Sequence, residues 1–193
     1  MAPKILVFAG STRSGAWSGK TADAAMKELA LQGAEVTRIS LADYPLPIMD
    51  EDLERREGIP DSAMKLGRQI AAHDGVLIAS PEYNASIPPL LKNTVDWVSR
   101  ISSNGRHPFK PFAGKPVALC SSSPGKFAGI RCLNHLRPVM MNVGAEVISA
   151  QCSIGLAEDA FYEDGALRDE RTAKMMATVC RSLIEYASVF KHR

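Results

Sequence analysis

The stretch KILVFAGSTRSGAWSGKT, residues 4 to 21, decides the fold of this chain. Its first part is a short apolar run that predicts a buried strand ending at Gly10. Its second part gathers Gly, Ser, Arg and Lys between that strand and a helical pattern. Polar turns in this position bind phosphate in many α/β proteins, because the free N–H groups and the dipole of the following helix attract anions. The sequence therefore predicts a phosphate-binding turn.

Two well-known phosphate motifs do not fit this turn. The P-loop, G-x-x-x-x-G-K-[ST], is matched at its end by Gly19, Lys20 and Thr21. Its first glycine is missing, because Ser14 occupies that position, and a P-loop kinase is therefore disfavoured. The dinucleotide motif G-x-G-x-x-G fails because Thr12 stands at the second glycine. A serine hydrolase is also disfavoured, because the chain has no G-x-S-x-G elbow.

Composition restricts the partners and the class of protein. The 193 residues suit a single domain over 1–193, and 46% of them are hydrophobic. A net charge of +2 is too small to indicate a nucleic-acid partner, and no apolar run is long enough to indicate a membrane span. No cleavable signal is visible before the first strand. Four widely spaced cysteines without C-x-x-C favour reduced thiols in a cytoplasmic protein and no metal site: Cys120, Cys132, Cys152 and Cys180.

The rest of the chain alternates strands with helices. Further strands are predicted over 34–41, 75–80, 115–122 and 145–151. Helical stripes are formed by Ala22, Ala25, Met26 and Leu29; by Leu66 and Ile70; by Leu91, Val95 and Val98; by Leu133, Leu136 and Met140; and by Met176, Val179, Leu183 and Tyr186. Five βα units predict an α/β, flavodoxin-like three-layer sandwich, with a five-stranded parallel sheet of order 2-1-3-4-5 and helices on both faces. The acidic, Pro-interrupted segment 42–62 is interpreted as a solvated linker, with a functional loop as the alternative.

Ligands of such sheets bind beyond the carboxyl ends of the strands, where three loops of unusual composition are expected. The first loop offers Ser11 and Ser18 as hydroxyl donors and Arg13 as a fixed positive charge, which suits a terminal monophosphate. The alternative interpretation is an ordinary Ser/Gly turn in which Ser18 caps the following helix.

The second loop, in SPEYNASIPPLLKNTVDW (80–97), is stiffened by prolines and places Pro81, Glu82, Tyr83 and Asn84 after a strand. Its rigid backbone suits the edge of a planar ring. Tyr83 has two interpretations, packing against that ring or against a partner subunit. Glu82 is a candidate general acid or, alternatively, a residue in an interface or in solvent. Asn93, Asp96 and Trp97 on the following helix are expected to serve packing and the surface.

The third loop, in CSSSPGKFAGIR (120–131), is rich in small donors. Ser121, Ser122, Ser123 and Gly125 would let the backbone approach a flat ligand closely. The alternative is a plain strand-to-helix turn with serine capping.

These loops resemble those of the NADPH-dependent FMN reductase family of flavodoxin-like proteins, which includes quinone, azo-dye and chromate reductases. The most specific match is P-E-Y-N-x-x-x-P-x-x-L-K-N-x-[VI]-D-W over residues 81–97. In the family's G-S-x-R-x-x-S-x-N loop, Ala16 and Ser18 replace the usual Ser and Asn. In its S-x-x-P-G-G-x-G-G-x-R region, Lys126 and Ala128 replace glycines.

The resemblance implies FMN as cofactor and NADPH as co-substrate. The phosphate would lie on residues 11–18, and the ring would lie between 81–84 and 121–125. The flavin would pass electrons to a small acceptor such as a quinone, free flavin, azo compound or chromate in a ping-pong cycle, so that no side chain is expected to be catalytic. The family also implies a homodimer or homotetramer with Glu82 and Tyr83 near subunit contacts.

Two other functions remain open at this point. One is an FMN electron carrier, although such carriers tend to be acidic and this chain has a pI near 8.4. The other is a redox or flavin sensor with little NADPH turnover, which the altered loop residues would suit. The histidines (His73, His107, His135 and His192) are scattered and carry no catalytic prediction. Charge alone makes Lys110, Lys115 and Arg131 candidates for the 2′-phosphate of NADPH.

Overall fold

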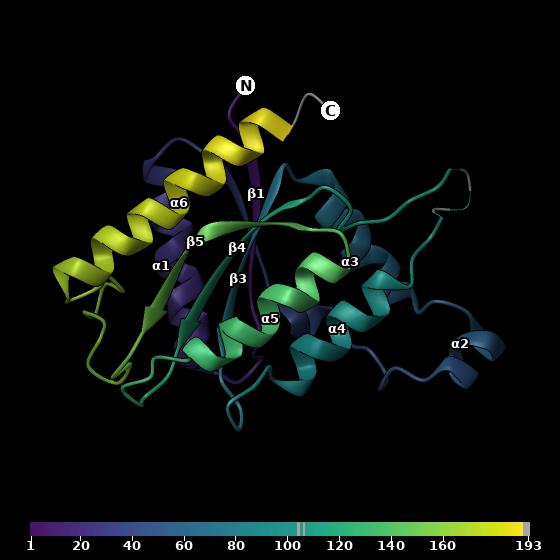
Figure 1. Cartoon of the computed structure of the whole chain (residues 1–193), viewed down its shortest axis with the longest axis horizontal. Helices are drawn as coiled ribbons and strands as arrows, with labels where there is room; N and C mark the ends of the chain where they lie inside the picture. The colour runs from purple at the N-terminus through teal and green to yellow at the C-terminus, as the bar shows by residue number, and fades with distance from the viewer. Residues whose placement is uncertain (104, 106, 191–193) are drawn as a thin grey trace.

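The computed structural model, which describes residues 1–103, 105 and 107–190, has the predicted α/β architecture (Figure 1). Its five strands form one parallel sheet in the order β2-β1-β3-β4-β5, which confirms the predicted order. The strands are β1 (Lys4–Ala9), β2 (Glu35–Ile39), β3 (Gly75–Pro81), β4 (Pro116–Ser122) and β5 (Glu146–Ile154).

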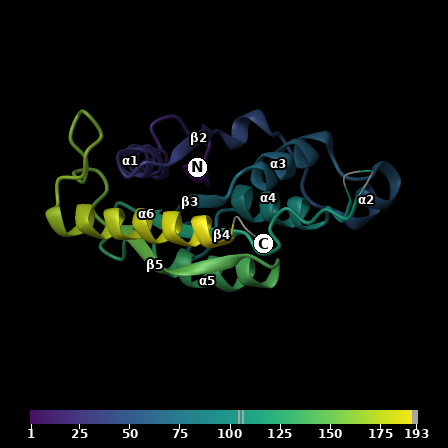
Figure 2. The same cartoon turned by 90° about the horizontal axis from the view of Figure 1, so that it is seen from above.

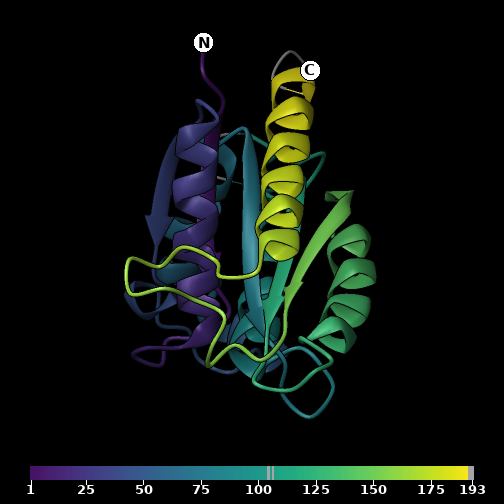
Figure 3. The same ribbon diagram turned by 90° about the vertical axis from the view of Figure 1, so that its left-hand side faces the viewer.

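Helices cover both faces of the sheet and make the molecule a three-layer sandwich (Figures 2 and 3). α1 (Trp17–Leu31) and α6 (Glu170–Phe190) lie side by side on one face. The other face carries α3 (Asp61–Ala72), α4 (Pro89–Ser99) and α5 (Ile130–Asn142). A 3₁₀ turn, η1 (Leu41–Asp43), and a short helix, α2 (Glu51–Glu57), complete the elements within the described residues.

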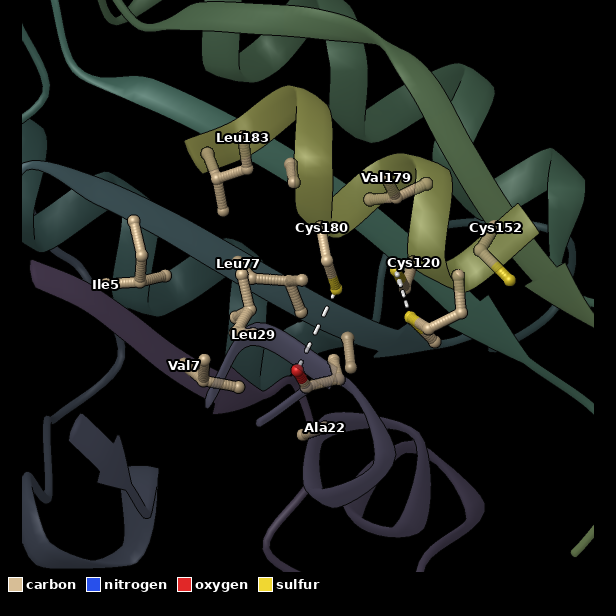
Figure 4. Packing of buried hydrophobic residues seen from close by; sticks show 14 of the residues in the cluster. Ile5, Val7, Ala22, Leu29, Leu77, Cys120, Cys152, Val179, Cys180 and Leu183 are labelled. Atoms are coloured by element: carbon tan, nitrogen blue, oxygen red, sulfur yellow. Dashed lines mark hydrogen bonds between the residues drawn. The ribbon is translucent and has the colours of Figure 1, made fainter. Parts of the chain in front are cut away.

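The three central strands are buried on both faces, which explains their continuous apolar sequences. In β1, Ile5 and Val7 point to the α1 and α6 side, whereas Leu6 points to the opposite core. Figure 4 shows the first of these cores, where Leu77 of β3 packs with Leu183 of α6. The alternation lets each strand supply side chains to two hydrophobic cores at once. The edge strand β2 is only partly buried, as its alternating sequence predicts.

The helical stripes bury the residues that their spacing predicts, except that Met26 of α1 is only partly buried and Tyr186 of α6 is exposed. Met176, Val179 and Leu183 of α6 are buried, but Tyr186 is 44% exposed. Ala187, four residues after Leu183, continues the buried face instead. The prediction for Tyr186 is wrong because a position three residues after Leu183 has rotated to the edge of the apolar stripe.

The segment 42–62 contains helical structure that the linker interpretation did not foresee. Asp50 accepts hydrogen bonds from the backbone N–H groups of Asp52 and Leu53 and thereby starts α2. No residue of α2 is buried, and the helix stands out from the body (Figures 1 and 2). Capping and charge, rather than burial, therefore define this helix.

Two side chains of α4 hold the start of this segment. Asn93 donates to the Pro47 carbonyl at 2.8 Å and accepts from the Met49 N–H at 2.7 Å. The buried Trp97 donates its indole N–H to the same carbonyl at 2.8 Å. The expected packing role of Asn93 and Trp97 is therefore what the structure shows. Within the described residues, no helix is long and apolar enough to cross a membrane.

We expect Asn93→Ala to loosen residues 45–60. The variant loses two backbone hydrogen bonds, which should lower the free energy of unfolding by roughly 1–2 kcal/mol. Limited proteolysis followed by mass spectrometry should find faster cleavage in this segment. The control is Asp96→Ala on the same helix, which loses only an exposed pair with Lys92 and should cost less than about 0.5 kcal/mol. Equal protection of 45–60 in both variants would contradict the role given to Asn93.

Candidate functional site

The loops after β1, β3 and β4 meet at the carboxyl edge of the sheet, as expected, and enclose a cleft of about 210 Å³. The cleft is lined by Ser11, Arg13, Ala16, Trp17, Ser18, Pro81, Glu82, Tyr83, Ser122, Ser123 and Pro124. Three predicted site residues are not in its lining: Asn84, Ser121 and Gly125. Trp17 and Pro124 also line the cleft; they lie within the predicted ranges 11–18 and 121–125 but were not named there as contacts.

The first loop presents a helix start without a side-chain cap. Ala16 occupies the N-cap of α1 and makes no capping hydrogen bond. Ser18 is helical, 1% exposed, and its hydroxyl has no partner, so the interpretation of Ser18 as the N-cap is wrong. The guanidinium of Arg13 reaches the Ser14 carbonyl, and no carboxylate among the described residues pairs with it. This loop therefore offers an anion unused N–H groups and an uncompensated positive charge.

Two buried hydroxyls without partners belong to residues that line this one cleft. In the described part of the chain, Ser18 Oγ and Ser122 Oγ are the buried side-chain N or O atoms that lack a hydrogen bond. They come from different elements, α1 and β4, yet both residues line the cleft. An unpaired buried hydroxyl costs roughly 1–3 kcal/mol. A ligand with polar atoms at both places would remove that cost, which makes the cleft a candidate ligand site.

The second loop is closed by a tight hairpin. Tyr83 and Ser86 exchange backbone hydrogen bonds of 3.1 and 2.9 Å. Between them, Asn84 and Ala85 both have positive φ, at 48° and 64°, as in a type I′ turn. Asn84 thus shapes the loop, while Tyr83 is 48% exposed at the mouth of the cleft.

Glu82 joins the second loop to the start of α5. Its side chain is 6% exposed, so the expectation of a solvent position is wrong. One carboxylate oxygen accepts the backbone N–H groups of Arg131 and Cys132, at 3.1 and 3.3 Å. The other accepts Nε and Nη2 of Arg131, at 2.9 and 2.5 Å. Both oxygens are therefore committed to the first turn of α5, which leaves neither free for a proton-transfer role.

The third loop is shaped by Ser121 and by two glycines, Gly125 and Gly129. Ser121 is fully buried and donates to the Ala128 carbonyl at 2.7 Å, and its hydroxyl lies 2.9 Å from that of Ser153. It therefore supports the loop from below. Gly125 donates its N–H to the Ser123 hydroxyl at 3.2 Å. A Cβ on Gly129, whose φ is +78°, would meet the Ser121 Cβ at 2.9 Å, so only glycine fits there.

A larger hollow of about 480 Å³ lies on the other side of this loop. Its lining includes Lys126, Leu156 and Arg168. The two cavities are separated by the loop, which packs on β5 where the Ser123 N–H donates to the Ile154 carbonyl. The 480 Å³ hollow has neither the strand-end loop of β1 nor an unpaired buried hydroxyl. The smaller cleft is the better ligand site for that reason.

The two lysine candidates lie away from the cleft: Lys115 is at the amino end of β4 and donates to the His73 carbonyl, and Lys110 lines a separate hollow. Arg131 is paired with Glu82, which lines the cleft. Of the four histidines, His192 lies outside the described residues. Burial raises the pKa of the Cys152 thiol to about 12 and raises the pKa of the other three thiols. No cluster of metal-ligating side chains occurs within the residues that the structure describes.

Comparison with known proteins places this geometry in a family. The family model for NADPH-dependent FMN reductases matches residues 3–159, and the chain belongs to that family. It is 39% identical over 147 residues to a quinone reductase of Escherichia coli, covering 76% of this chain and 73% of that protein. It is 32% identical over 182 residues to a NAD(P)H-dependent FMN reductase of Pseudomonas aeruginosa, covering 93% of this chain and 92% of that protein.

A solved structure agrees with these comparisons. The flavoenzyme NAD(P)H:(acceptor) oxidoreductase FerB of Paracoccus denitrificans superposes with a TM-score of 0.78 at 27% identity, covering 97% of this chain and 98% of that one. The chain is thus a flavodoxin-like oxidoreductase with FMN as cofactor and NAD(P)H as co-substrate. The chemistry of the cleft suits a phosphate, because Arg13 and the unpaired Ser18 hydroxyl lie at the start of α1, and Ser122 adds an unpaired hydroxyl at the end of β4.

Ala128 holds a conformation that favours glycine, with φ at +58°. We expect Ala128→Gly to raise the free energy of unfolding by about 1 kcal/mol, because glycine removes the left-handed strain. The matched control is Ala30→Gly on the exposed side of α1, which should lower it by about 1 kcal/mol. Denaturant titration measures both values. Equal signs for the two variants would rule out strain at Ala128.

Proposed function

We propose that this protein is an FMN-dependent NAD(P)H oxidoreductase that delivers electrons to a small acceptor, with a quinone as the first choice and free flavin, azo compounds and chromate as further ones. The observation that carries the proposal is the pair of unpaired buried hydroxyls, Ser18 and Ser122, in a cleft with the free cation Arg13. The name of the quinone reductase relative supports the choice of acceptor.

The residues divide the work of holding the cofactor. Ser11, Arg13 and Ser18 would bind the phosphate, with Arg13 supplying the balancing charge. The backbone of 81–83 and the polar groups of Ser122 and Ser123 would hold the ring. Asn84, Ser121 and Gly125 would act on the shape of the two ring loops.

Bound FMN would supply the redox chemistry, accepting a hydride from NADPH and passing the electrons to the second substrate in a ping-pong cycle. The chain's own contribution is to bind, orient and exclude water. No side chain of the cleft is assigned as a general acid or base. Glu82 is the carboxylate residue in the cleft lining, and both of its oxygens accept hydrogen bonds from the first turn of α5.

A flavin-binding sensor or electron carrier with little NADPH turnover is the second candidate. It is favoured by Ala16, which lines the cleft at a position where the resembled family pattern G-S-x-R-x-x-S-x-N has a serine, so that one donor is missing. We also propose a homodimer or homotetramer acting in the cytoplasm. The four free, buried cysteines are compatible with a reducing compartment.

The visible spectrum of the purified protein with FMN, before and after anaerobic NADPH, tests the proposal. We expect tightly held flavin that is bleached by NADPH and recoloured by 1,4-naphthoquinone. Flavin that binds but is not bleached would favour the sensor or carrier. Failure to bind FMN at micromolar concentration would overturn the cofactor site itself.

Three serine variants test the site independently of turnover. Ser18→Ala and Ser122→Ala should each weaken FMN binding by about tenfold, which is the value of one hydrogen bond to a polar ligand. Neither should destabilise the FMN-free protein, because the removed hydroxyls have no partner there. The control Ser121→Ala should lower the free energy of unfolding by roughly 1–2 kcal/mol, because its hydroxyl is bonded. Flavin fluorescence titration and denaturant unfolding measure the two effects. If Ser18→Ala and Ser122→Ala destabilise the FMN-free protein as Ser121→Ala does, the two hydroxyls are structural and not reserved for a ligand.

A further inference from the structure

A chain of three side chains links the two ring loops and ends on an exposed aromatic ring. The buried carboxylate of Glu82 holds the guanidinium of Arg131 by two hydrogen bonds. The Cζ of Arg131 in turn lies 5.0 Å from the centroid of the Phe127 ring. Phe127 belongs to the loop after β4, whereas Glu82 belongs to the loop after β3. One ion pair therefore fixes both loops and positions the ring.

The exposure of Phe127 is not explained by the fold. Its side chain is 68% exposed, although it follows closely on Ser123 and Pro124, which line the cleft. Tyr83 on the facing loop is 48% exposed. Single exposed apolar residues are common on proteins. Phe127 differs from most of them because a cation, itself held by a buried carboxylate, limits the freedom of its ring.

A second arginine–aromatic pair lies elsewhere in the molecule. Arg168 lies 4.6 Å from the ring centroid of Tyr162, which is 51% exposed. Arg168 is held by the Phe161 carbonyl, and both residues belong to the loop between β5 and α6. Neither Phe127 nor Tyr162 is itself in the lining of the 210 Å³ cleft, but Phe127 follows Pro124 of that lining in the same loop, whereas no residue of the loop between β5 and α6 lines the cleft. This pair is therefore a matched control for an aromatic ring that an arginine positions.

We propose that Phe127 is a specificity-determining residue that forms a side wall for planar, uncharged aromatic acceptors of the quinone class. The inference rests on the proposed function, because it concerns the acceptor of that site. The guanidinium of Arg131 occupies part of the ring and leaves the rest open for stacking or edge-to-face contact. A non-planar anionic acceptor gains nothing from such a contact. The ring should therefore select among acceptors.

Binding to the oxidised, FMN-loaded protein tests this without turnover. We expect Phe127→Ala to raise the dissociation constant of 1,4-naphthoquinone about fivefold to tenfold in calorimetry, because aromatic pairs contribute on that scale. Phe127→Tyr should restore the parent value, since the ring is kept. Tyr162→Ala should bind as the parent does.

Steady-state kinetics with two acceptors separates specificity from general damage. The ratio of KM for 1,4-naphthoquinone to KM for ferricyanide should rise about fivefold to tenfold in Phe127→Ala. Ferricyanide serves as the non-planar anion. The same ratio should stay at the parent value in Tyr162→Ala and in Phe127→Tyr.

Several outcomes would overturn the inference. One is an unchanged naphthoquinone affinity in Phe127→Ala; another is an equal rise in KM for both acceptors. A change of oligomeric state in Phe127→Ala, seen by sedimentation without any loss of quinone affinity, would assign the ring to a subunit contact instead. In each case the proposed function still holds if NADPH bleaches the flavin of the parent protein. Flavin that NADPH does not bleach would overturn the proposed function, and the inference with it.

Discussion

The burial of the three central strands on both faces is the constraint on which the rest of the molecule depends. Because the apolar side chains of β1, β3 and β4 fill the two cores, the middle of the sheet has no room for a ligand. Since the strands are parallel, their carboxyl ends all lie at one edge, and the loops that leave them must meet there. The cleft is thus a consequence of the sheet, and its chemistry depends on what the three loops carry.

The positions of the loops are fixed largely by contacts outside the cleft. Glu82 turns its carboxylate to the first turn of α5, and Ser121 supports the next loop from below. A carboxylate with 6% exposure is costly to bury unless it is fully hydrogen-bonded, which the four donors of Arg131 and Cys132 accomplish. The two ring loops are therefore positioned by one buried charge. Residues that read as ligand contacts in the sequence can serve the site through such support.

The sequence was sufficient to predict the strands and helices, because period-2 and period-3.6 patterns report burial directly. The five βα units then indicated the strand order and the three loops that meet at the carboxyl edge. It could not distinguish side chains that point into the cleft from those that point under a loop, since Ser121 and Ser122 are neighbours of the same type. Their strand alternation, with Ser122 facing the cleft and Ser121 facing Ser153, depends on register. The short helix α2 was missed for a different reason: it buries nothing, so no apolar period announced it.

Substitutions chosen only to raise the stability of the ligand-free protein would remove the two unpaired hydroxyls. Ser18 and Ser122 are buried without partners, and an apolar residue of similar size would remove that cost in the absence of a ligand. Positive φ at Ala128 adds strain in the loop that follows β4. Both features lie where the three loops converge, and both are absent from the well-satisfied cores. These local costs lie at one edge of the sheet, and the free energy of binding a ligand at that edge would offset them.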